Sequence, residues 1–550
     1  MRACPTSVRS SLLMVALCLL EARALAAGQA ANGSQSDGGY RIAGTVVSIV
    51  DGHPLGRARI SLKNAKDPQK LQSMVTSEDG RFGFAQLPAG KYTLVGEKRG
   101  FISAAYDEHD QLSTAIVTGA GVDTETLVLR LAPEAVITGR VLDEVGEPVR
   151  RATVALYYDD HSAGMDQIHQ IRSAQTDDQG TYEIAPVTPG TYFLSASGKP
   201  WYAVYPSLES ERQATASIDR SLDVAYPVTY YPDVTEADGA TPIPVRGGDR
   251  VQVDIHLNPV PALRLLFHVS DNGPHGMPHP QLQQSVFDGS TSVQSGGEHV
   301  VSPGVLEVTG IPAGRYSVRT SGDGPALQMN GIDLSKDGQE IDTSSAEILS
   351  SVKVSVHLPG ESALPQPLAV GLRSGNRGVA WHQVNSKGEA ELPQIAAGRY
   401  EVLVGGAEKP YAVAHISAEG GAISGHTLTV TAGSSIALSL TLAGGSVEVL
   451  GTVKRAGKAV AGAMVVLVPK DPEANRDLFR RDQTDLDGTF SLREVVPGSY
   501  TVVAIEKGWD LDWSRPNVLA AYLKGGRMIE VGNQKGRAIN LAEAIEVQSK

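Results

Sequence analysis

The sequence predicts an all-β protein built as a tandem array of about five β-sandwich domains. Three observations predict this class. A short phrase with a turn glycine and a Gly-x-Tyr triplet recurs five times along the 550 residues. Apolar and polar residues alternate around each copy, and strands do not alternate regularly with long helices. The 59 glycines and 31 prolines, with only 5% aromatic residues, suit many short strands joined by turns.

The clearest copy of this phrase runs from Thr76 to Val95. Asp79-Gly80 lies between alternating apolar runs, which is a strong signal for a tight hairpin turn. Phe82 and Phe84 then alternate with small residues, and a Pro-Ala-Gly break precedes Tyr92 at the start of the next strand. The signature residues of the five copies are Gly80, Phe82, Gly90 and Tyr92; Gly180, Tyr182, Gly190 and Tyr192; Gly314 and Tyr316; Gly398 and Tyr400; and Gly488, Phe490, Gly498 and Tyr500.

The first 26 residues are expected to be a signal peptide. Arg2 and Arg9 form a positive segment, Ser11 to Leu20 is a short apolar run, and Ala24-Leu25-Ala26 is a small-x-small cleavage site. The apolar run is shorter than the ~20 residues that a membrane helix needs. We therefore expect an exported chain, in the periplasm, on the outer surface or outside the cell, with no integral membrane segment after the signal is removed.

The remaining composition narrows the classes of partner and chemistry. Both cysteines, Cys4 and Cys18, lie in the signal segment, so the mature chain is expected to contain no thiol and no disulfide. A lipid anchor on Cys18 is the less favoured alternative. Known lipoprotein signals have a small residue directly before the lipidated cysteine, and this chain has Leu17 there. The net charge is -13 and no block of lysine and arginine stands out, so nucleic acid is not an expected partner. Residues 27–39 are rich in Gly, Ser, Ala and Gln and predict a disordered leader.

We refer to residues 40–132, 133–259, 260–343, 344–443 and 444–550 as modules 1 to 5. Module 1 predicts strands at 42–49, 58–62 and 124–131, besides those of the repeat phrase. Module 2 restarts in the same way with Ile137 to Val141 and closes with the alternating strand Val251 to Leu257. Between these strands lies a long excursion, residues 201–246, which has no counterpart in module 1.

Modules 3 and 4 are degenerate copies, and module 5 is clear again. Ala463 to Val468 in module 5 is apolar at every position, so both faces of this strand are expected to be buried. The second face needs a cover, for which Trp509, Trp513 and the segment Pro516 to Leu523 are the candidates. That segment is also the best candidate for a short helix. About seven short strands per module is the pattern of a two-sheet sandwich.

The repeat phrase resembles the carboxypeptidase regulatory-like domain. This domain is a transthyretin-like (prealbumin-like) β-sandwich, related in fold to Cna B-type and starch-binding-like domains. Three copies match clearly and two loosely, so the resemblance covers most of the mature chain. The resemblance implies a transthyretin-like sandwich for modules 1, 2 and 5, and it is a weak guide to function. Strings of such modules look like exported bacterial envelope proteins.

No pattern of catalytic residues is evident. The sequence has no G-x-S-x-G elbow, no H-E-x-x-H, no P-loop and no G-x-G-x-x-G after a strand, so we expect a non-enzyme without cofactor or metal. His275 and His279 have a spacing that suits a metal only on a helix, and the prolines around them favour a flexible polar loop. Asp485-x-Asp487-Gly488 lacks the later acidic ligands of a calcium loop, so a backbone turn is favoured.

Aromatic residues supply the candidate ligand sites. The first choice is the group in the long excursion, namely Trp201, Tyr202, Tyr205, Tyr226, Tyr230 and Tyr231. The second choice is Trp509 and Trp513. Aromatic rings stack on sugars and anchor protein interfaces, but the favoured interpretation of the first group is that it pins a long loop to its own module. The five signature tyrosines are expected to fill the sandwiches and to cap nearby backbone, as tyrosine corners do.

The sequence thus predicts an exported, non-catalytic, multi-domain protein of the cell envelope with a structural or binding role. Carbohydrate is the favoured ligand class, through the resemblance to the starch-binding-like fold, so the expected partner is a polysaccharide or an envelope protein. Two alternatives stay open: an adhesion or scaffold module that binds proteins, and an accessory subunit of a secreted hydrolase.

Overall fold

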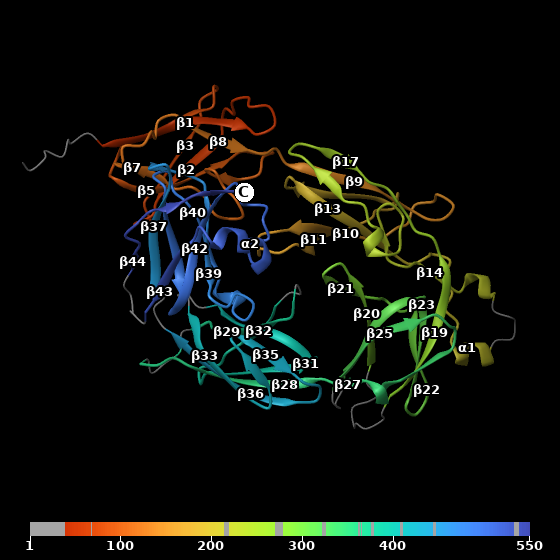
Figure 1. Ribbon diagram of the computed structural model, residues 1–550. Helices are drawn as coiled ribbons and strands as arrows, with labels where there is room; N and C mark the ends of the chain where they lie inside the picture. The colour runs from red at the N-terminus through yellow and green to blue at the C-terminus, as the bar shows by residue number, and fades with distance from the viewer. Residues whose placement is uncertain are drawn as a thin grey trace, which may run out of the picture. The chain divides into compact units, whose positions relative to one another are not determined.

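Strands account for almost all regular structure in this chain (Figure 1). The computed structural model describes residues 39–67, 69–213, 219–269, 279–321, 326–360, 364, 366–375, 379–406, 411–443, 447–532 and 538–550. The strands of these residues form ten sheets, and Tyr40–Lys550 is one compact unit. The predicted signal peptide, nearly all of the predicted leader, and His275 lie outside the described residues.

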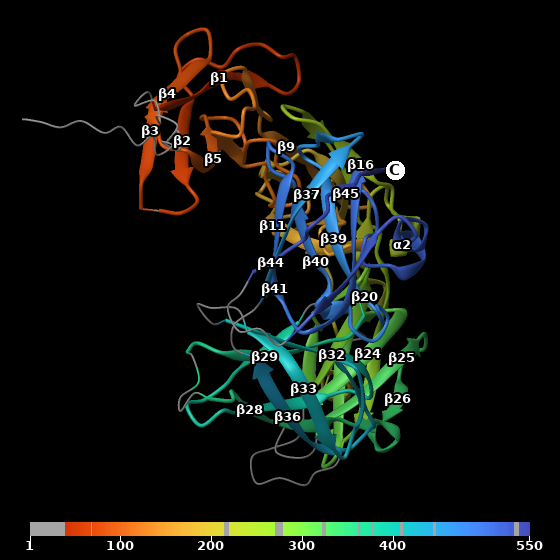
Figure 2. The same cartoon turned by 60° about the vertical axis from the view of Figure 1, so that its left-hand side comes forward.

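Module 1 is a two-sheet sandwich (Figure 2). Its first sheet has the order β4 (Arg81–Leu87), β1 (Tyr40–Ser48), β8 (Leu127–Leu131). Its second sheet has the order β3 (Leu71–Val75), β2 (Arg59–Asn64), β5 (Gly90–Glu97), β6 (Ala104–Ala105), and β7 (Ile116–Thr118) also pairs with β5.

Module 2 repeats this plan. One sheet has β9 (Ala135–Leu142) beside β12 (Thr181–Val187), β17 (Arg250–Gln252) and β18 (Ile255–His256). The other sheet has the order β11 (Gln167–Gln175), β10 (Thr153–Asp160), β13 (Gly190–Ser197), β15 (Thr229–Tyr230), and β16 (Ile243–Val245) also pairs with β13. The excursion further contains helix α1 (Leu208–Gln213) and the 3-10 turns η1 (Arg220–Leu222) and η2 (Ala237–Gly239).

Modules 3 and 4 are also sandwiches. The first sheet of module 3 has the order β14 (Val224–Ala225), β19 (Val260–His268), β23 (Val305–Pro312), β22 (Gly297–Ser302), and β26 (Gln339–Asp342) also pairs with β19. Its second sheet has the order β21 (Gly289–Ser292), β20 (His279–Val286), β24 (Gly314–Ser321), β25 (Leu327–Leu334), β27 (Glu347–Ile348). The turn η3 (Thr343–Ser345) follows β26. The first sheet of module 4 has the order β31 (Glu389–Ile395), β28 (Ser350–His357), β36 (Ser435–Ala443), β33 (Ala412–Glu419). Its second sheet has the order β30 (Ala380–Gln383), β29 (Ala369–Arg373), β32 (Gly398–Gly405), β35 (Thr427–Val430), β34 (Ala422–Ser424).

Module 5 completes the series. Its first sheet has the order β38 (Lys458–Ala459), β37 (Val447–Arg455), β41 (Thr489–Val495), with β44 (Ile539–Asn540) and β45 (Ile545–Glu546) on β37. Its second sheet has the order β40 (Arg480–Gln483), β39 (Met464–Pro469), β42 (Gly498–Glu506), β43 (Arg527–Val531), with β46 (Gln548–Ser549) on β42. The turn η4 (Arg476–Leu478) precedes β40, and helix α2 spans Pro516–Leu523.

One connectivity is common to all modules. The first strand of each module pairs antiparallel with the strand after the repeat turn and parallel with the closing strand. The second sheet always pairs β2, β10, β20, β29 or β39 with the strand that begins at the Gly-x-Tyr triplet of the same module. This recurrence includes modules 3 and 4, whose sequence signature is weak. The predicted all-β architecture of tandem sandwiches is therefore confirmed.

The turn glycine explains part of the recurrence. The glycines at the five turns have φ between +70° and +85°. The carbonyl of each turn glycine accepts a hydrogen bond from the first strand, as in Val453 N to Gly488 O at 2.8 Å. A Cβ at Gly488 would lie 2.7 Å from the Val453 carbonyl oxygen, so only glycine fits there without a shift.

The signature tyrosines have one geometry in all five modules. Each hydroxyl donates a hydrogen bond to the carbonyl four residues upstream, which is the arrangement of a tyrosine corner. The pairs are Tyr92 to Pro88 at 3.0 Å, Tyr192 to Thr188 at 2.7 Å, Tyr316 to Pro312 at 2.8 Å, Tyr400 to Ala396 at 2.9 Å and Tyr500 to Val496 at 3.0 Å. The rings of these tyrosines pack against the hydrophobic cores of their modules.

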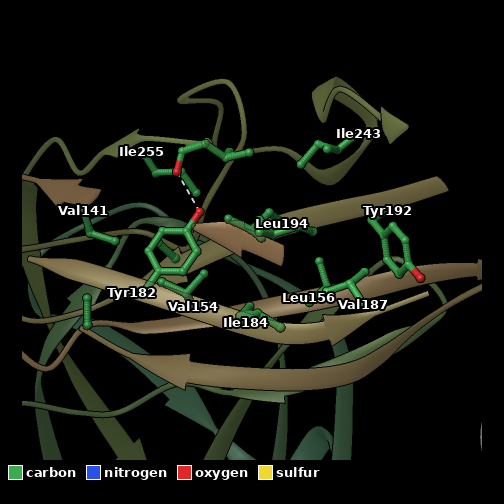
Figure 3. Packing of buried hydrophobic residues seen from close by; sticks show 14 of the residues in the cluster. Val141, Val154, Leu156, Tyr182, Ile184, Val187, Tyr192, Leu194, Ile243 and Ile255 are labelled. Atoms are coloured by element: carbon green, nitrogen blue, oxygen red, sulfur yellow. Dashed lines mark hydrogen bonds between the residues drawn. The ribbon is translucent and has the colours of Figure 1, made fainter. Parts of the chain in front are cut away.

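Figure 3 shows the core of module 2, where side chains of both sheets meet. Tyr182 and Tyr192 are almost wholly buried there. The Tyr182 hydroxyl donates to the Val253 carbonyl at 2.6 Å, so the ring that follows the repeat turn is tied to the closing strand (Figure 3). Each module has such a cluster of its own.

Module 5 has an additional apolar layer. All six residues of β39 are buried, and alternate ones belong to two different clusters. Met464, Val466 and Val468 pack on the outer side with Leu519 of α2, and Trp509 and Trp513 lie against the same cluster. The predicted cover and the predicted short helix are both confirmed, because a strand that is apolar on both faces must be buried on both.

Two strands cross the predicted module boundaries. β14 belongs to the excursion of module 2 but pairs antiparallel with β19, the first strand of module 3. β27 lies beyond residue 343 but pairs with β25 of module 3. Neighbouring modules therefore share sheet edges. No described helix is both long and apolar enough to span a bilayer.

Candidate functional site

The excursion 201–246 connects modules 2 and 3. β15 and β16 extend a sheet of module 2, whereas β14 extends a sheet of module 3. The ring of Tyr205 lies against the backbone of module 3, since a Cβ at Gly296 would come within 2.4 Å of it and one at Gly310 within 2.8 Å. The excursion therefore holds the two sandwiches together over much of its length.

Buried charge secures the α1 end of the excursion. The Leu208 N–H donates to the carboxylate of Glu307, whose residue is 0% exposed, at 2.9 and 3.2 Å. Arg264 of β19 forms salt bridges with Glu211 at 3.1 Å and with Asp337 at 3.3 Å. Burial opposes the charge of Arg264, but these carboxylates outweigh it and raise the pKa of the guanidinium. The network makes this contact a specific, charge-paired junction.

A second junction of modules 2 and 3 is aromatic. Phe287 lies at the tip of the β20–β21 hairpin of module 3. Its ring centroid is 5.0 Å from those of Tyr157 and Phe193 and 5.5 Å from that of Tyr230. The Asp288 carboxylate accepts a hydrogen bond from the backbone of β11 at 2.8 Å. The hairpin of module 3 thus inserts into an aromatic recess on the outer face of module 2.

The six aromatic residues of the excursion differ in exposure. Tyr230 is 1% exposed and Tyr226 is 6% exposed, so both rings belong to the interior. Trp201 is 82% exposed and makes an edge contact with Tyr202 at 5.7 Å. The remaining three, Tyr202, Tyr205 and Tyr231, are half-buried. The structure thus leaves Trp201 as the ring with a free face, and the role of the group in ligand binding stays a prediction.

Glu144 orients two of these tyrosines. Its carboxylate accepts hydrogen bonds from the hydroxyls of Tyr202 and Tyr226. Burial, followed by the hydrogen bond to Glu144, raises the pKa of Tyr202 to about 12. Burial and the charge of Glu144 also raise the pKa of Tyr226. Both hydroxyls are therefore neutral donors at physiological pH, and they fix the excursion against the Asp143–Gly146 turn.

A cleft of about 340 Å³ lies where the excursion meets both modules. Tyr205 and Tyr226 form part of its wall. The other lining residues are Arg150, Arg151, Thr153, Gln175, Ser197, Gly198, Lys199, Ala225, Val228, Gln284, Thr291, Ser292, Val293, Gln294, Gly310 and Pro312. Three of these residues are cations and none is a carboxylate. In a chain of net charge -13, this lining is a local concentration of positive charge.

The cations of the cleft are available to a ligand. Arg150, Arg151 and Lys199 are exposed, and none of them forms a salt bridge with a carboxylate in the described part of the chain. Lys199 donates to the Ser295 carbonyl of module 3 at 2.8 Å, which holds its ammonium group at the rim. Threonine, serine and glutamine side chains supply neutral hydrogen-bond partners around these charges. The arrangement can bind an anionic, hydroxyl-rich molecule.

Trp509 and Trp513 lie at another junction. The His109 ring of module 1 stacks on Trp509 with centroids 4.7 Å apart and an interplanar angle of 8°. The guanidinium of Arg481 lies 5.5 Å from the Trp509 centroid and 4.7 Å from that of Trp513. Arg481 also pairs with Asp110 of module 1 at 2.9 Å. These tryptophans are thus engaged with neighbouring side chains, and their role in ligand binding stays a prediction.

The repeat turn of module 5 contacts module 1 directly. Lys91 forms a salt bridge with Asp485 and donates to Thr489 Oγ1 at 2.9 Å. The Ala115 N–H donates to the Asp485 carboxylate at 3.0 Å, and Leu486 packs against the core of module 1. Within the turn, the Gly488 N–H donates to the Asp485 carbonyl at 2.8 Å. The segment is therefore a turn, as predicted, and it also serves as a docking point.

One group of side chains has metal-ligating atoms close together. Donor atoms of Asp159, His161 and Asp166 lie within 4.8 Å of one another in the β10–β11 hairpin. His161 Nδ1 is 2.8 Å from an Asp166 oxygen and 3.6 Å from an Asp512 oxygen of module 5. Asp512 also pairs with Arg515 at 3.1 Å. The contacts of His161 are ion pairs only when its ring is protonated, and the spacing of the three residues matches no ligand motif that the sequence could have revealed.

The fold and the cleft define a class: a multi-domain β-sandwich protein whose modules share one topology and pack on one another. Residues 41–130 and 136–222 match the carboxypeptidase regulatory-like domain, so modules 1 and 2 carry the resemblance that the repeat phrase predicts. Residues 446–522 match the second beta sandwich domain of the BOS complex subunit NOMO1-like family. None of the curated proteins compared matches this chain significantly.

Several solved structures match this chain at low sequence identity and low TM-score. The Bacillus anthracis TIE protein is 12% identical over 74% of this chain and 75% of its own, with a TM-score of 0.17. GBS52, the minor pilin of Streptococcus agalactiae, is 14% identical over 40% of this chain and 97% of its own, with a TM-score of 0.21. The shaft pilin SpaA of Lactobacillus rhamnosus GG is 10% identical over 40% of this chain and 98% of its own, with a TM-score of 0.18. At these scores the likeness carries no argument about function.

Proposed function

We propose that this chain is an exported, non-catalytic binding protein of the cell envelope, and that the cleft between modules 2 and 3 binds an anionic polysaccharide. The observation that carries the proposal is the lining of the cleft. It contains Arg150, Arg151 and Lys199 and no carboxylate, within a chain of net charge -13. The exposed indole of Trp201 lies two residues beyond Lys199 and offers a ring on which a sugar can stack.

A polymer suits this cleft better than a small anion. Each exposed ion pair contributes only about 0.2–1 kcal/mol, so three such pairs bind a single acidic sugar weakly. A chain of repeated uronic acids occupies the cleft and its surroundings together, and rebinding raises the apparent affinity. The open, polar lining offers hydroxyl and amide partners without demanding one shape. Binding of this kind weakens as the salt concentration rises.

The experiment is affinity gel electrophoresis of the mature chain in gels that contain polygalacturonate, with dextran as the neutral comparison. We expect retardation by polygalacturonate that decreases between low salt and 0.3 M NaCl. Arg151→Gln combined with Lys199→Gln should reduce the retardation about tenfold, since two of the three cations are lost. An unretarded wild-type chain, or an unaffected double variant, would contradict the proposal.

Module 1 provides a matched control. Arg57 occupies the place in module 1 that Arg151 occupies in module 2, because their φ angles are 56° and 58° and their N–H groups donate to the threonine carbonyls of the two repeats at 3.1 Å. Arg57 does not line the cleft. Arg57→Gln should therefore carry the same backbone cost as Arg151→Gln and leave retardation by polygalacturonate unchanged.

A scaffold role is the second candidate function. The observation that favours it is the set of junctions between modules, which bury Glu307 and Tyr230 and make the described modules one compact unit. A compact unit of several modules can present more than one surface to a protein partner. If polygalacturonate binding fails, this alternative is tested by crosslinking the mature chain in intact cells and identifying the envelope proteins attached to it.

A further inference from the structure

A second aromatic feature lies outside the cleft, on module 4. Trp381 of the edge strand β30 is 48% exposed. It sits directly opposite Gly371 of β29 in the antiparallel register. Gly405 of the next strand, β32, pairs with Ala369, two residues before Gly371. Residues paired in this way point to the same face of a sheet, so the indole and both glycines share the outer face.

The two glycines form a floor under the indole. A Cβ at Gly371 would lie 2.9 Å from Cε3 of Trp381, and one at Gly405 would lie 3.1 Å from Cη2. The six-membered ring therefore lies over two strands. Val379 Cγ1 also lies over Gly371, 2.4 Å from where a Cβ would be, and 48% of the Trp381 surface remains exposed. Glycine within a strand costs about 0.5–1 kcal/mol and often marks a close approach to another group. An aromatic ring over a cross-strand glycine offsets part of this cost, and here Trp381 also keeps 48% of its surface exposed.

Polar groups flank this ring on the same face. Arg373 pairs with Glu401 across β29 and β32, with Nε 2.7 Å from the carboxylate, and this pair lies two register positions from Gly371 and four from Gly405. The ion pair uses two of the five N–H donors of Arg373, and this side chain makes no other bond among the described residues; the side chain is 25% exposed. Gln383, two residues beyond Trp381 on β30, is exposed on the other side. A flat apolar surface thus lies between a charged pair and an amide.

We propose that Trp381 and its glycine floor form a carbohydrate platform that stacks on one pyranose ring of a neutral polysaccharide. A pyranose has an apolar face that suits the indole and a rim of hydroxyls that suits Arg373, Glu401 and Gln383. A protein partner needs on the order of 800 Å² of complementary surface, and an isolated indole between charged groups does not supply it. The opposite charges of Arg373 and Glu401 cancel, which favours a neutral sugar. The platform is separate from the cleft, and the inference does not depend on anionic ligands.

The test uses affinity gel electrophoresis of the full mature chain with five neutral probes: barley β-glucan, glucomannan, xyloglucan, laminarin and dextran. At least one probe should retard the wild-type chain. Trp381→Ala should weaken that retardation about tenfold, which is the size expected for one lost stacking contact. Tyr40→Ala is the control, because Tyr40 is 46% exposed on β1 of module 1, away from module 4, and it should leave neutral binding unchanged.

Gly405→Ala gives an independent variant that keeps the tryptophan. The new methyl group would press on the indole from below and tilt it, so binding should weaken several-fold while the thermal unfolding midpoint changes little. If Trp381→Ala does not fold, Gly405→Ala decides the matter alone. The proposal is overturned if none of the five probes retards the wild-type chain, or if the folded variants bind as the wild type does. Retardation by polygalacturonate is unaffected in either case, so the two proposals fail separately.

Discussion

Replacing Lys91 tests how modules 1 and 5 are held together. The ammonium group of Lys91 contacts the carboxylate of Asp485 and donates to Thr489 Oγ1 at 2.9 Å. The Lys91 side chain is 38% exposed and that of Asp485 is 13% exposed. Lys91→Met keeps most of the aliphatic chain but leaves Asp485 with the Ala115 N–H, at 3.0 Å, as its remaining partner across the junction.

The expected cost lies between two known limits. Breaking a fully buried ion pair costs about 3–5 kcal/mol, and an exposed pair contributes about 0.2–1 kcal/mol. Since Asp485 is largely buried and Lys91 is more than one-third exposed, we expect about 2 kcal/mol at pH 7. Asp485→Asn in the same chain should recover part of this loss, because no unpaired charge then remains at the junction.

The loss should depend on pH. Burial raises the pKa of Asp485, whereas Lys91 lowers it, so Lys91→Met raises this pKa further. A carboxyl group whose pKa is raised in the folded state favours folding at low pH, and that contribution is lost as the pH rises through the folded-state pKa. The penalty of Lys91→Met should therefore be largest at neutral pH and should shrink in acid, where Asp485 takes up a proton.

Thermal unfolding at pH 7 and pH 4, with hydrogen exchange of residues 483–489, measures this effect. Lys70→Met is the matched control, because Lys70 is 79% exposed and pairs with Asp67 at 3.2 Å on the surface of the same module. It should change stability by less than about 0.5 kcal/mol. The reasoning is refuted if the two variants behave alike at pH 7, or if the penalty of Lys91→Met is as large at pH 4 as at pH 7.

Three further predictions concern the modules themselves. Tyr316→Phe removes the hydroxyl hydrogen bond to the carbonyl four residues upstream and should cost about 1 kcal/mol in chemical denaturation. Gly488→Ala should lower the melting temperature more than Gly457→Ala, because both glycines have positive φ, +76° and +81°, but only the first would press a Cβ on a carbonyl oxygen, at 2.7 Å. Burial raises the pKa of Asp482 to about 6, so stability should fall as the pH rises from 5 to 7.5, and Asp482→Asn should flatten this dependence in melting experiments.

The repeated units could be predicted from sequence because their signals are local. A turn needs a residue that tolerates positive φ, and the corner needs glycine and tyrosine at a fixed spacing. Both requirements therefore restrict the residue type at positions that lie close together in the sequence. Module 3 shows how far this extends: its turn keeps Gly304, at φ +79°, and its corner keeps Tyr316, although little else of the phrase remains.

The same local logic identified the extra layer of module 5. Six consecutive apolar residues in one strand require cover on both faces, and Leu519 of α2 supplies part of it. The sequence also showed which aromatic residues are unusual, but not which of them are exposed. Trp201 and Tyr230 are both aromatic residues of the same excursion, and nothing in the sequence distinguishes their burial, whereas Trp201 is 82% exposed and Tyr230 is 1% exposed.

Contacts between modules could not be predicted, because the residues that form them follow no repeating pattern in the sequence. Phe287 packs on Tyr157 and Tyr230 only through the folding of two separate sandwiches. β14 pairs outside its own module because the excursion is long enough to reach β19. The basic cleft likewise brings together segments that are far apart in the sequence, among them those around residues 150, 199, 226 and 292. The floor under Trp381 depends on strand register, which single-sequence patterns do not fix.

The most direct test of the proposed function is to locate the ligand on the molecule. Hydrogen exchange of the mature chain should be measured with and without polygalacturonate at low salt. The account predicts slower exchange in residues 150–153, 197–206 and 291–294, and in no comparable segment of module 1. Unchanged exchange in these three segments, or protection confined to other modules, would contradict it.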